Sequence, residues 1–214
     1  MILTPRPFMK ECEFDPGAHR YWGPGGEILP SVTTILKAEG ISRYSNGPSV
    51  DSLMQIGTWV HDMVRMFERG TLDESALAVS MRGYLDSYRT WKAMAGIIPL
   101  VVEQPLFSPR WKFAGTPDIL GALAVPEADV RFAVVDLKTG SLRAGDRIQV
   151  SGYMGLAREC YEELEKEFMV GHVVYLRSDG GMPRVEQVDV LGMEEGLNLF
   201  RGALSLNRWK IVNK

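Results

Sequence analysis

An apolar run in the second half of the chain is followed at once by charged residues. The letters FAVV at 132–135 read as a buried strand, with Asp136 directly after it and Lys138 two residues later. Because side chains alternate along a strand, both charges point to one face, while Val135 and Leu137 point to the other. Burying a charge without a partner is costly, so this strand end must hold either an ion pair or a site that uses the charges.

A second carboxylate stands at a bend upstream of this strand. Asp118 ends the segment GTPD at 115–118, where glycine and proline bend the strand and let the carboxylate project from the sheet. If its strand is the antiparallel neighbour of the one that carries Asp136, two carboxylates and the ammonium of Lys138 share one patch. Carboxylates that close repel each other unless a divalent cation holds them. The pattern predicts a metal site beside a lysine, and the alternative is an ordinary salt bridge.

The composition of the 214 residues sets the frame for such a site. With 45% apolar residues and a formal charge of −3, we expect one compact domain that is not coated with basic residues. Cys12 and Cys160 lie far apart, so we expect no disulfide framework, thiolate metal site or iron–sulfur cluster. No apolar run approaches the ~20 residues of a membrane span, so we expect a cytoplasmic protein with no membrane partner.

Hydrophobic periodicity predicts the order of the elements. It indicates helices at 49–69, 74–95, 144–167 and 194–207, strands at 100–107, 112–123, 131–138, 168–177 and 184–190, and an N-terminal hairpin at 11–30 followed by a short helix capped by Ser31 or Thr33. Helices, a three-strand meander, a helix, two strands and a last helix are typical of an α/β domain. We therefore expect a mixed sheet covered by helices.

Several short motifs resemble, in order, those of the PD-(D/E)XK nuclease superfamily, and in particular its RecB-like exonuclease branch. They are IGTWVHDMV at 56–64, VVEQPLF at 101–107, GTPD at 115–118, VVDLKTG at 134–140 and QVSGY at 149–153. LPSVTTIL at 29–36 also looks like the segment that opens the nuclease region in phage exonucleases and in the mitochondrial single-strand exonuclease. The resemblance implies a restriction-endonuclease-like α/β core with a central mixed sheet flanked by helices. It also implies a single nuclease domain over 1–214, in which 1–48 pack on a core of 49–214.

The resemblance also implies a set of site residues. The catalytic ones are Asp118, Asp136, Lys138, Gln149 and Tyr153, and the metal ligands are His61, Asp118, Asp136, the backbone carbonyl of Leu137 and, as the weakest candidate, Glu103. The metal is Mg²⁺ or Mn²⁺, and an imidazole ligand favours Mn²⁺. Lys138 either orients or deprotonates the attacking water or stabilises negative charge, and the sequence does not separate these roles.

Each of these residues also has an ordinary structural alternative. His61, beside Val60 and Val64, fits a hydrogen-bonded histidine of a helix interior. Gln149 and Tyr153, four residues apart on a predicted helix, fit simple packing. A second pair, Arg143 and Arg147, lies close enough to the predicted site to bind backbone phosphates, but also fits a solvated loop and helix face.

The function that the resemblance implies is that of a metal-dependent DNA exonuclease, which hydrolyses phosphodiester bonds at DNA ends in recombination, repair or end processing, and a phage-encoded protein is compatible with it. Its partner is DNA with free ends, single- or double-stranded, and the resemblance adds a single-strand annealing protein. A structure-selective endonuclease of the same fold and a non-catalytic nucleic-acid-binding module are the alternatives. The chain contains no GxxxxGK[ST], HExxH or GxSxG, which removes the usual signatures of an ATP-driven motor, a zincin and an α/β-hydrolase.

Overall fold

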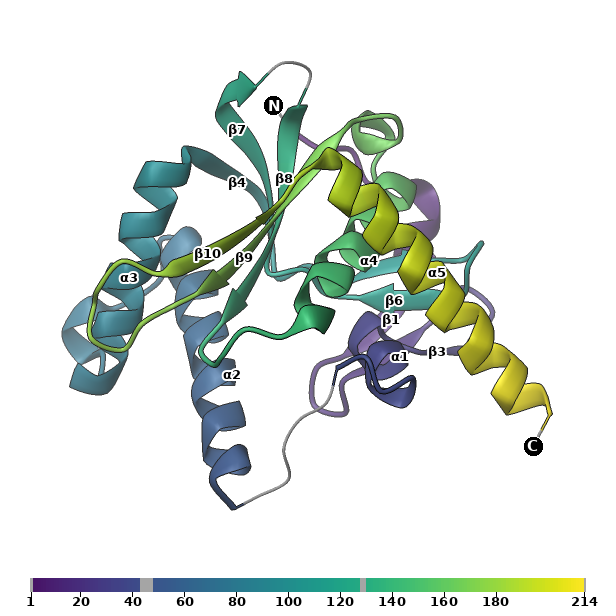
Figure 1. Cartoon of the computed structure of the whole chain (residues 1–214), viewed down its shortest axis with the longest axis horizontal. Coiled ribbons are helices and arrows are strands. Elements are labelled where there is room, and N and C mark those ends of the chain that lie inside the picture. Colours follow the sequence, from purple (N-terminus) through teal and green to yellow (C-terminus); the bar gives the residue numbers. More distant parts are fainter. Residues whose placement is uncertain (1, 43–47, 128–129, 214) are drawn as a thin grey trace.

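A five-stranded mixed sheet forms the centre of the computed structural model, which describes residues 2–42, 48–127 and 130–213 (Figure 1). The strand order is β10-β9-β8-β7-β4, with β4 at Ile97–Val102, β7 at Ile119–Glu127, β8 at Val130–Lys138, β9 at Met169–Tyr175 and β10 at Arg184–Val188. β8 and β9 run parallel, and the other neighbours run antiparallel. The predicted α/β fold class, a mixed sheet flanked by helices, is confirmed.

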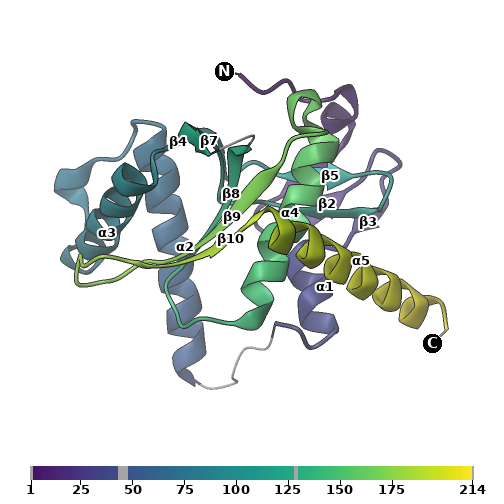
Figure 2. The same ribbon diagram turned by 45° about the horizontal axis from the view of Figure 1, so that its top comes forward.

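Helices cover both faces of this sheet (Figures 1 and 2). One layer consists of α2 (Pro48–Glu68) and α3 (Val79–Ala95), and the other of α1 (Val32–Ala38), α4 (Ala144–Cys160) and α5 (Val190–Val212). The alternation along β8 divides the core between them. Val135 and Leu137 pack with α2 and α3, whereas Phe132 and Val134 belong to the cluster of α1, α4 and α5.

The same alternation fixes where the charged end of β8 points. Asp136 follows Phe132 and Val134 at steps of two, so it faces the layer that contains α4. Parallel strands need a crossover connection, and α4 is the crossover between β8 and β9. The first turns of α4 are therefore brought over the end of β8.

The N-terminal segment adds a small antiparallel sheet of β1 (Glu13–Asp15), β2 (Arg20–Trp22) and β3 (Ile28–Leu29) beside the central domain. The GPGG stretch at 23–26 turns the chain between β2 and β3, and Gly26 takes a positive φ of 75° that suits glycine. Ser31 caps α1, because its hydroxyl oxygen accepts a hydrogen bond of 3.0 Å from the backbone of Thr34. The predicted hairpin and capped helix are both present.

The predicted three-strand meander was wrong in detail. The segment 100–107 divides into the end of β4 and β5 (Leu106–Ser108), and β5 pairs with β6 (Phe113–Gly115) in a separate hairpin. The break falls at Glu103, whose φ of 49° is incompatible with an extended strand, and at Pro105. Segment 112–123 divides in the same way between β6 and β7, across Pro117.

Three helix boundaries also differ from the prediction. α4 ends at Cys160 because Tyr161 is extended and its ring is buried in the core, and a 3₁₀ turn, η3 (Glu162–Leu164), follows. α3 begins at Val79 instead of residue 74, and a separate 3₁₀ turn, η2 (Glu74–Ala76), precedes it. α5 is longer than the predicted 194–207 because Asp189 caps its start. A further 3₁₀ turn, η1 (Pro7–Glu11), precedes β1.

Within the described ranges, none of the helices has the length and apolar character needed to cross a bilayer.

Two helical glycines provide a matched test of the packing between α3 and the β9–β10 connection. A Cβ on Gly83 would meet the carbonyl oxygen of Ser178 at 1.9 Å, whereas a Cβ on Gly202 of α5 would meet nothing within 4 Å. We expect Gly83→Ala to lower the free energy of unfolding by about 1–3 kcal/mol through overpacking. Gly202→Ala should raise it by about 0.5–1 kcal/mol through helix propensity. Urea denaturation of both variants measures this, and a stabilised Gly83→Ala would contradict the close contact.

Candidate active site

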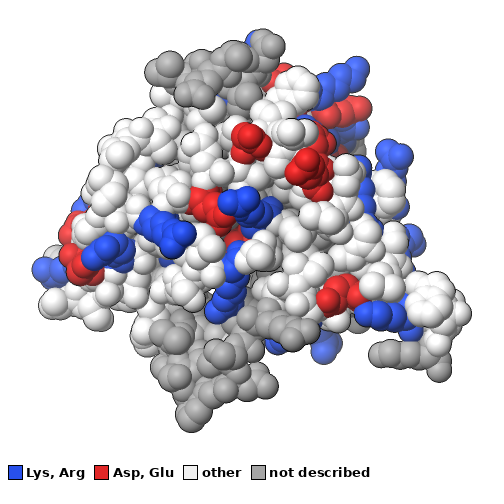
Figure 3. Space-filling model, viewed as in Figure 1, with Lys and Arg blue, Asp and Glu red and all other residues white. Residues whose placement is uncertain are grey.

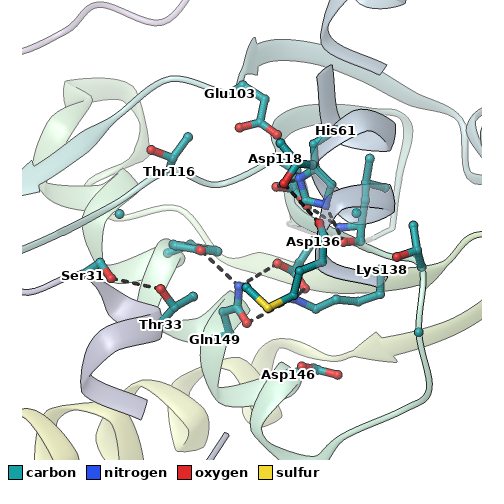
Figure 4. Close-up of a pocket in the computed structure, with 18 of the residues that line it drawn as sticks. Ser31, Thr33, His61, Glu103, Thr116, Asp118, Asp136, Lys138, Asp146 and Gln149 are labelled. Atoms are coloured by element: carbon teal, nitrogen blue, oxygen red, sulfur yellow. Dashed lines mark hydrogen bonds and ion pairs between the residues drawn. The ribbon is translucent and has the colours of Figure 1, made fainter. Parts of the chain in front are cut away.

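A cavity of about 540 Å³ opens at the end of the sheet where β7 begins and β8 ends. Its lining includes His61, Glu103, Asp118, Asp136, Leu137, Lys138, Arg143, Gln149 and Tyr153, which are all of the predicted site residues except Arg147. They come from α2, the end of β4, the start of β7, the end of β8 and α4 (Figure 4). Residues far apart in the sequence thus converge on one pocket.

The strand pairing sets the floor of this cavity. Ile119 of β7 is opposite Val135 of β8, so Asp118 and Asp136 are the next positions at the end of the same antiparallel pair. A carboxylate oxygen of Asp118 accepts a hydrogen bond from the backbone amide of Leu137. Both aspartates are deeply buried, at 5% exposure for Asp118 and 1% for Asp136. Two acidic groups in this position need cations close to them.

Glu103 is held against this floor by its backbone. Its amide donates a hydrogen bond of 3.0 Å to the carbonyl of Asp118, and its φ of 49° lies in the left-handed region. A residue other than glycine adopts that conformation at an energetic cost, and such strain is concentrated at functional sites. The bend brings the carboxylate of Glu103 to the side of His61 (Figure 4).

The imidazole of His61 lies among three oxygen atoms. Its Nδ1 is 3.0 Å from Asp118 Oδ1 and 3.1 Å from Glu103 Oε1, and its Nε2 is 3.1 Å from the carbonyl oxygen of Leu137. A carbonyl and ionised carboxylates only accept hydrogen bonds, so both ring nitrogens act as donors and the ring is an imidazolium. Burial opposes that charge, but Asp118 and Glu103 outweigh it and raise the pKa of His61 well above the usual value of 6.5.

These residues can hold a metal ion. One donor atom each from His61, Glu103 and Asp118 lie within 4.8 Å of one another. Two carboxylates and an imidazole match the donors that Mn²⁺ and related divalent ions accept. The imidazolium of His61 lies between the carboxylates of Asp118 and Glu103, so the electrostatic environment there favours a positive charge. Asp136 is not a member of that three-residue group and faces α4 instead.

The carboxylate of Asp136 belongs to a second set of contacts that connects β8 to α4. Lys138 Nζ lies 2.7 Å from Asp136 Oδ2 and donates a 3.2 Å hydrogen bond to Gln149 Oε1. The amide nitrogen of Gln149 donates in turn to Asp136 Oδ1 at 2.8 Å and to the hydroxyl of Tyr153 at 3.1 Å. Asp136 Oδ2 is buried and, apart from this ion pair, has no hydrogen-bond partner among the described residues. The ammonium of Lys138 is thus the only contact of that oxygen among the described residues.

The electrostatics of this network follow from burial and from the crowding of carboxylates. Burial raises the pKa of Asp136 to about 7, because the attraction of Lys138 is partly cancelled by Asp118 and Asp146. Burial alone would lower the pKa of Lys138, but the charges of Asp136, Asp146 and Asp118 raise it above its usual value. Lys138 is therefore a cation at neutral pH, and Asp136 is placed near the midpoint of its titration.

Asp146 is a buried residue of this site that the sequence reasoning missed. It is the third residue of α4, where one of its carboxylate oxygens accepts hydrogen bonds from the backbone of Arg143 at 3.1 Å and from the hydroxyl of Tyr175 at 2.9 Å. An acidic residue three positions after the capping residue of a helix is a capping signal. The hydrogen bond between Asp146 and the backbone of Arg143 could therefore have been predicted from the sequence. Its proximity to Lys138 depends on the tertiary structure.

The two predicted phosphate-binding arginines differ in position. Arg143 precedes α4 and lines the cavity. Arg147 forms an ion pair with Glu186 of β10 and is not part of the lining. The role of both in substrate binding stays a prediction, and the position of Arg143 fits it better.

The opposite wall of the cavity comes from the N-terminal sheet and was also missed. Tyr21 and His19 of the β1–β2 region line it, and the hydroxyls of Tyr21 and Thr116 are 2.9 Å apart. Ser31 and Thr33 of α1 line the same side (Figure 4). The N-terminal segment therefore contributes directly to the pocket and is attached to the GTPD turn.

Comparison with known proteins gives little beyond this geometry. No family model matches the chain, and no curated protein matches it. Among solved structures, a protein from Eubacterium rectale described as a "Putative exonuclease" aligns with 88% of this chain and 74% of its own, at 13% identity and a TM-score of 0.45. The fold class stated above therefore rests on the sheet and helices of the chain itself.

The histidines provide a test of the charge around the metal-binding group. In metal-free protein we expect His61 to titrate above pH 6.5, because Asp118 and Glu103 raise its pKa, and His172 to titrate below pH 6.5, because burial lowers its pKa. The charged ring of His61 stabilises the fold fully below pH 6.5, and this contribution is lost as pH rises through its folded pKa. NMR titration, with assignment by His61→Gln and His172→Gln, measures both pKa values. A His61 pKa at or below 6.5 would contradict the imidazolium geometry.

Proposed function

We propose that this protein is a metal-dependent nuclease of the PD-(D/E)XK type that hydrolyses phosphodiester bonds at DNA ends. The observation that carries the proposal is the proximity of Asp118 and Asp136 where β7 begins and β8 ends, with Lys138 beside Asp136 and with His61 and Glu103 beside Asp118. Phosphodiester hydrolysis requires cations for the phosphoryl oxygens, an activated water and a stabilised leaving oxygen. This pocket collects groups suited to each requirement.

Each residue has a role that follows from its contacts. His61, Glu103, Asp118 and the carbonyl of Leu137 would hold Mn²⁺ or Mg²⁺, and Asp136 Oδ2 would complete the ligands. When bound, such an ion neutralises charge on the phosphate and lowers the pKa of a coordinated water. Mn²⁺ is the better match, because the imidazole nitrogen is a softer donor than oxygen.

Lys138 is suited to stabilise charge rather than to accept a proton. Its pKa is raised by the surrounding carboxylates, so the ammonium keeps its proton at neutral pH. A fixed cation of this kind stabilises the negative charge that develops on the phosphoryl group. The amide of Gln149, which contacts both Lys138 and Asp136, holds the two side chains in place, and Tyr153 supports the amide.

The burial of the aspartates supports action at ends. A phosphodiester has to descend to the floor of the cavity to reach Asp118 and Asp136, which a free end does more readily than the middle of an intact duplex.

The direct test is hydrolysis of end-labelled linear single- and double-stranded DNA, beside closed circles, in Mn²⁺, Mg²⁺ or EDTA. We expect linear DNA to be degraded only with a divalent ion, and Asp136→Asn and Lys138→Met each to lower the rate by at least about 100-fold. Asp86→Asn and Lys112→Met are matched controls, because both side chains are exposed and lie outside the cavity. Thermal unfolding of all four variants separates lost chemistry from lost folding.

The other outcomes discriminate between the alternatives. Cutting of closed circles would replace the exonuclease with an endonuclease. No cutting, together with retained DNA binding, would leave a non-catalytic binding module. Full activity of Asp136→Asn would overturn the proposed mechanism.

A further inference from the structure

A second groove adjoins the cavity just described. It has a volume of about 360 Å³ and shares Gly140 and Ser141 with the first, so the two are continuous along the loop that follows β8. Its other walls are Leu142 and two parts of the β9–β10 hairpin, residues 175–177 and 182–184. A chain that leaves the carboxylate floor on this side passes directly into the groove.

The groove differs in charge from the floor of the cavity. The side chains that line it include Arg177 and Arg184, and none of its described lining residues is acidic. The guanidinium of Arg184 is exposed and forms no ion pair with any described residue. In the region where Figure 1 places this hairpin, between the left edge and the middle of the face, Figure 3 shows Lys and Arg side chains with Asp and Glu side chains beside them. On a chain with a formal charge of −3, the lining of the groove itself is therefore basic.

The opposite wall of the first cavity has a different character. It is lined by His19, Tyr21, Ser31 and Thr33, and none of them is Lys or Arg. Cations for a polyanion are therefore arranged on one side of the carboxylate floor, toward Arg143 and the groove. A strand that places its phosphates on this side can turn its bases toward the wall that lacks Lys and Arg.

The hairpin that carries these arginines is anchored. The backbone amide of Arg177 donates a 3.2 Å hydrogen bond to Ser87 of α3, and Gly83 of α3 allows close approach to Ser178. Asp179 forms a two-point ion pair with the guanidinium of Arg177 and accepts a 3.0 Å hydrogen bond from Gly181. The arginines thus stand on a positioned element, with Arg177 partly neutralised and Arg184 open to a ligand.

We infer that the groove between the loop at 140–142 and the β9–β10 hairpin binds the phosphate backbone of a single nucleic-acid strand adjoining the scissile bond. Arg184 is the main phosphate contact, and Arg177 is a second one whose charge Asp179 restrains. This inference rests on the proposed function, because the occupant is the continuation of the proposed substrate. The inference is tested by measuring DNA binding, which does not depend on hydrolysis.

The experiment measures the affinity of wild-type protein in EDTA for a fluorescein-labelled oligothymidylate of about eight nucleotides, by fluorescence anisotropy over a range of salt concentrations. Losing one phosphate contact on a single strand should reduce the slope of log K against log salt by about 0.7. We expect Arg184→Gln to show this reduction, with a Kd about fivefold higher at low salt. Asp179→Asn should increase the slope, because it releases Arg177 while keeping an acceptor for Gly181.

Controls separate this site from a general charge effect. Arg110→Gln removes an exposed arginine on the β5–β6 turn, outside both cavities, and should leave the slope unchanged. A labelled thymidine dinucleotide should lose no affinity with Arg184→Gln, because it is too short to extend from the floor into the groove. A blunt duplex should show a smaller change than the single strand.

Unchanged binding of the single strand in both Arg184→Gln and Asp179→Asn would overturn the inference, whatever the nuclease assay shows. A duplex that responds as much as the single strand would overturn the assignment to one strand. Failure of metal-dependent hydrolysis, with the slope changes intact, would count against the proposed function and leave the groove as a binding site.

Discussion

The structure of this site depends on the burial of carboxylates at the end of one antiparallel strand pair. Asp118 and Asp136 are almost fully buried, and Glu103 and Asp146 lie beside them. Such a concentration of negative charge is stable only if cations accompany it, and the imidazolium of His61 and the ammonium of Lys138 are in direct contact with the two aspartates. His61 contacts Asp118 and Glu103, and Lys138 contacts Asp136 and Gln149, so the pocket is divided into a histidine–carboxylate side and a lysine–amide side.

The mixed sheet makes this division possible. Antiparallel pairing of β7 and β8 aligns the two aspartates, and the parallel step from β8 to β9 requires a crossover helix that carries Gln149 and Tyr153 over the same strand end. On the other face, α2 brings His61 to the carbonyl of Leu137, whose side chain packs into the core beneath it. Asp136, Leu137 and Lys138, the last three residues of β8, therefore belong both to the sheet and to the site.

Sequence reasoning predicted the main elements and most of the pocket. The order of helices and central strands, the cap at Ser31 and the shared face of Asp136 and Lys138 follow from local periodicity, and the structure contains them. The division of the segment 100–107 was not predicted, because the conformation of Glu103 is imposed by its contact with Asp118, a residue of another strand. The end of α4 was missed because Tyr161 is drawn into the core by distant neighbours.

What the sequence by itself determined is the set of chemical groups and their local spacing: which side chains share a strand face, which lie one helical turn apart, and which turns glycine and proline allow. The tertiary structure alone decided which of these groups meet. It paired Asp118 with His61, paired Asp136 with Lys138, brought Asp146 and Tyr175 together, and placed Arg184 along a groove that continues the cavity. The physical reason is that burial and charge act between residues distant in the chain, and only packing sets those distances.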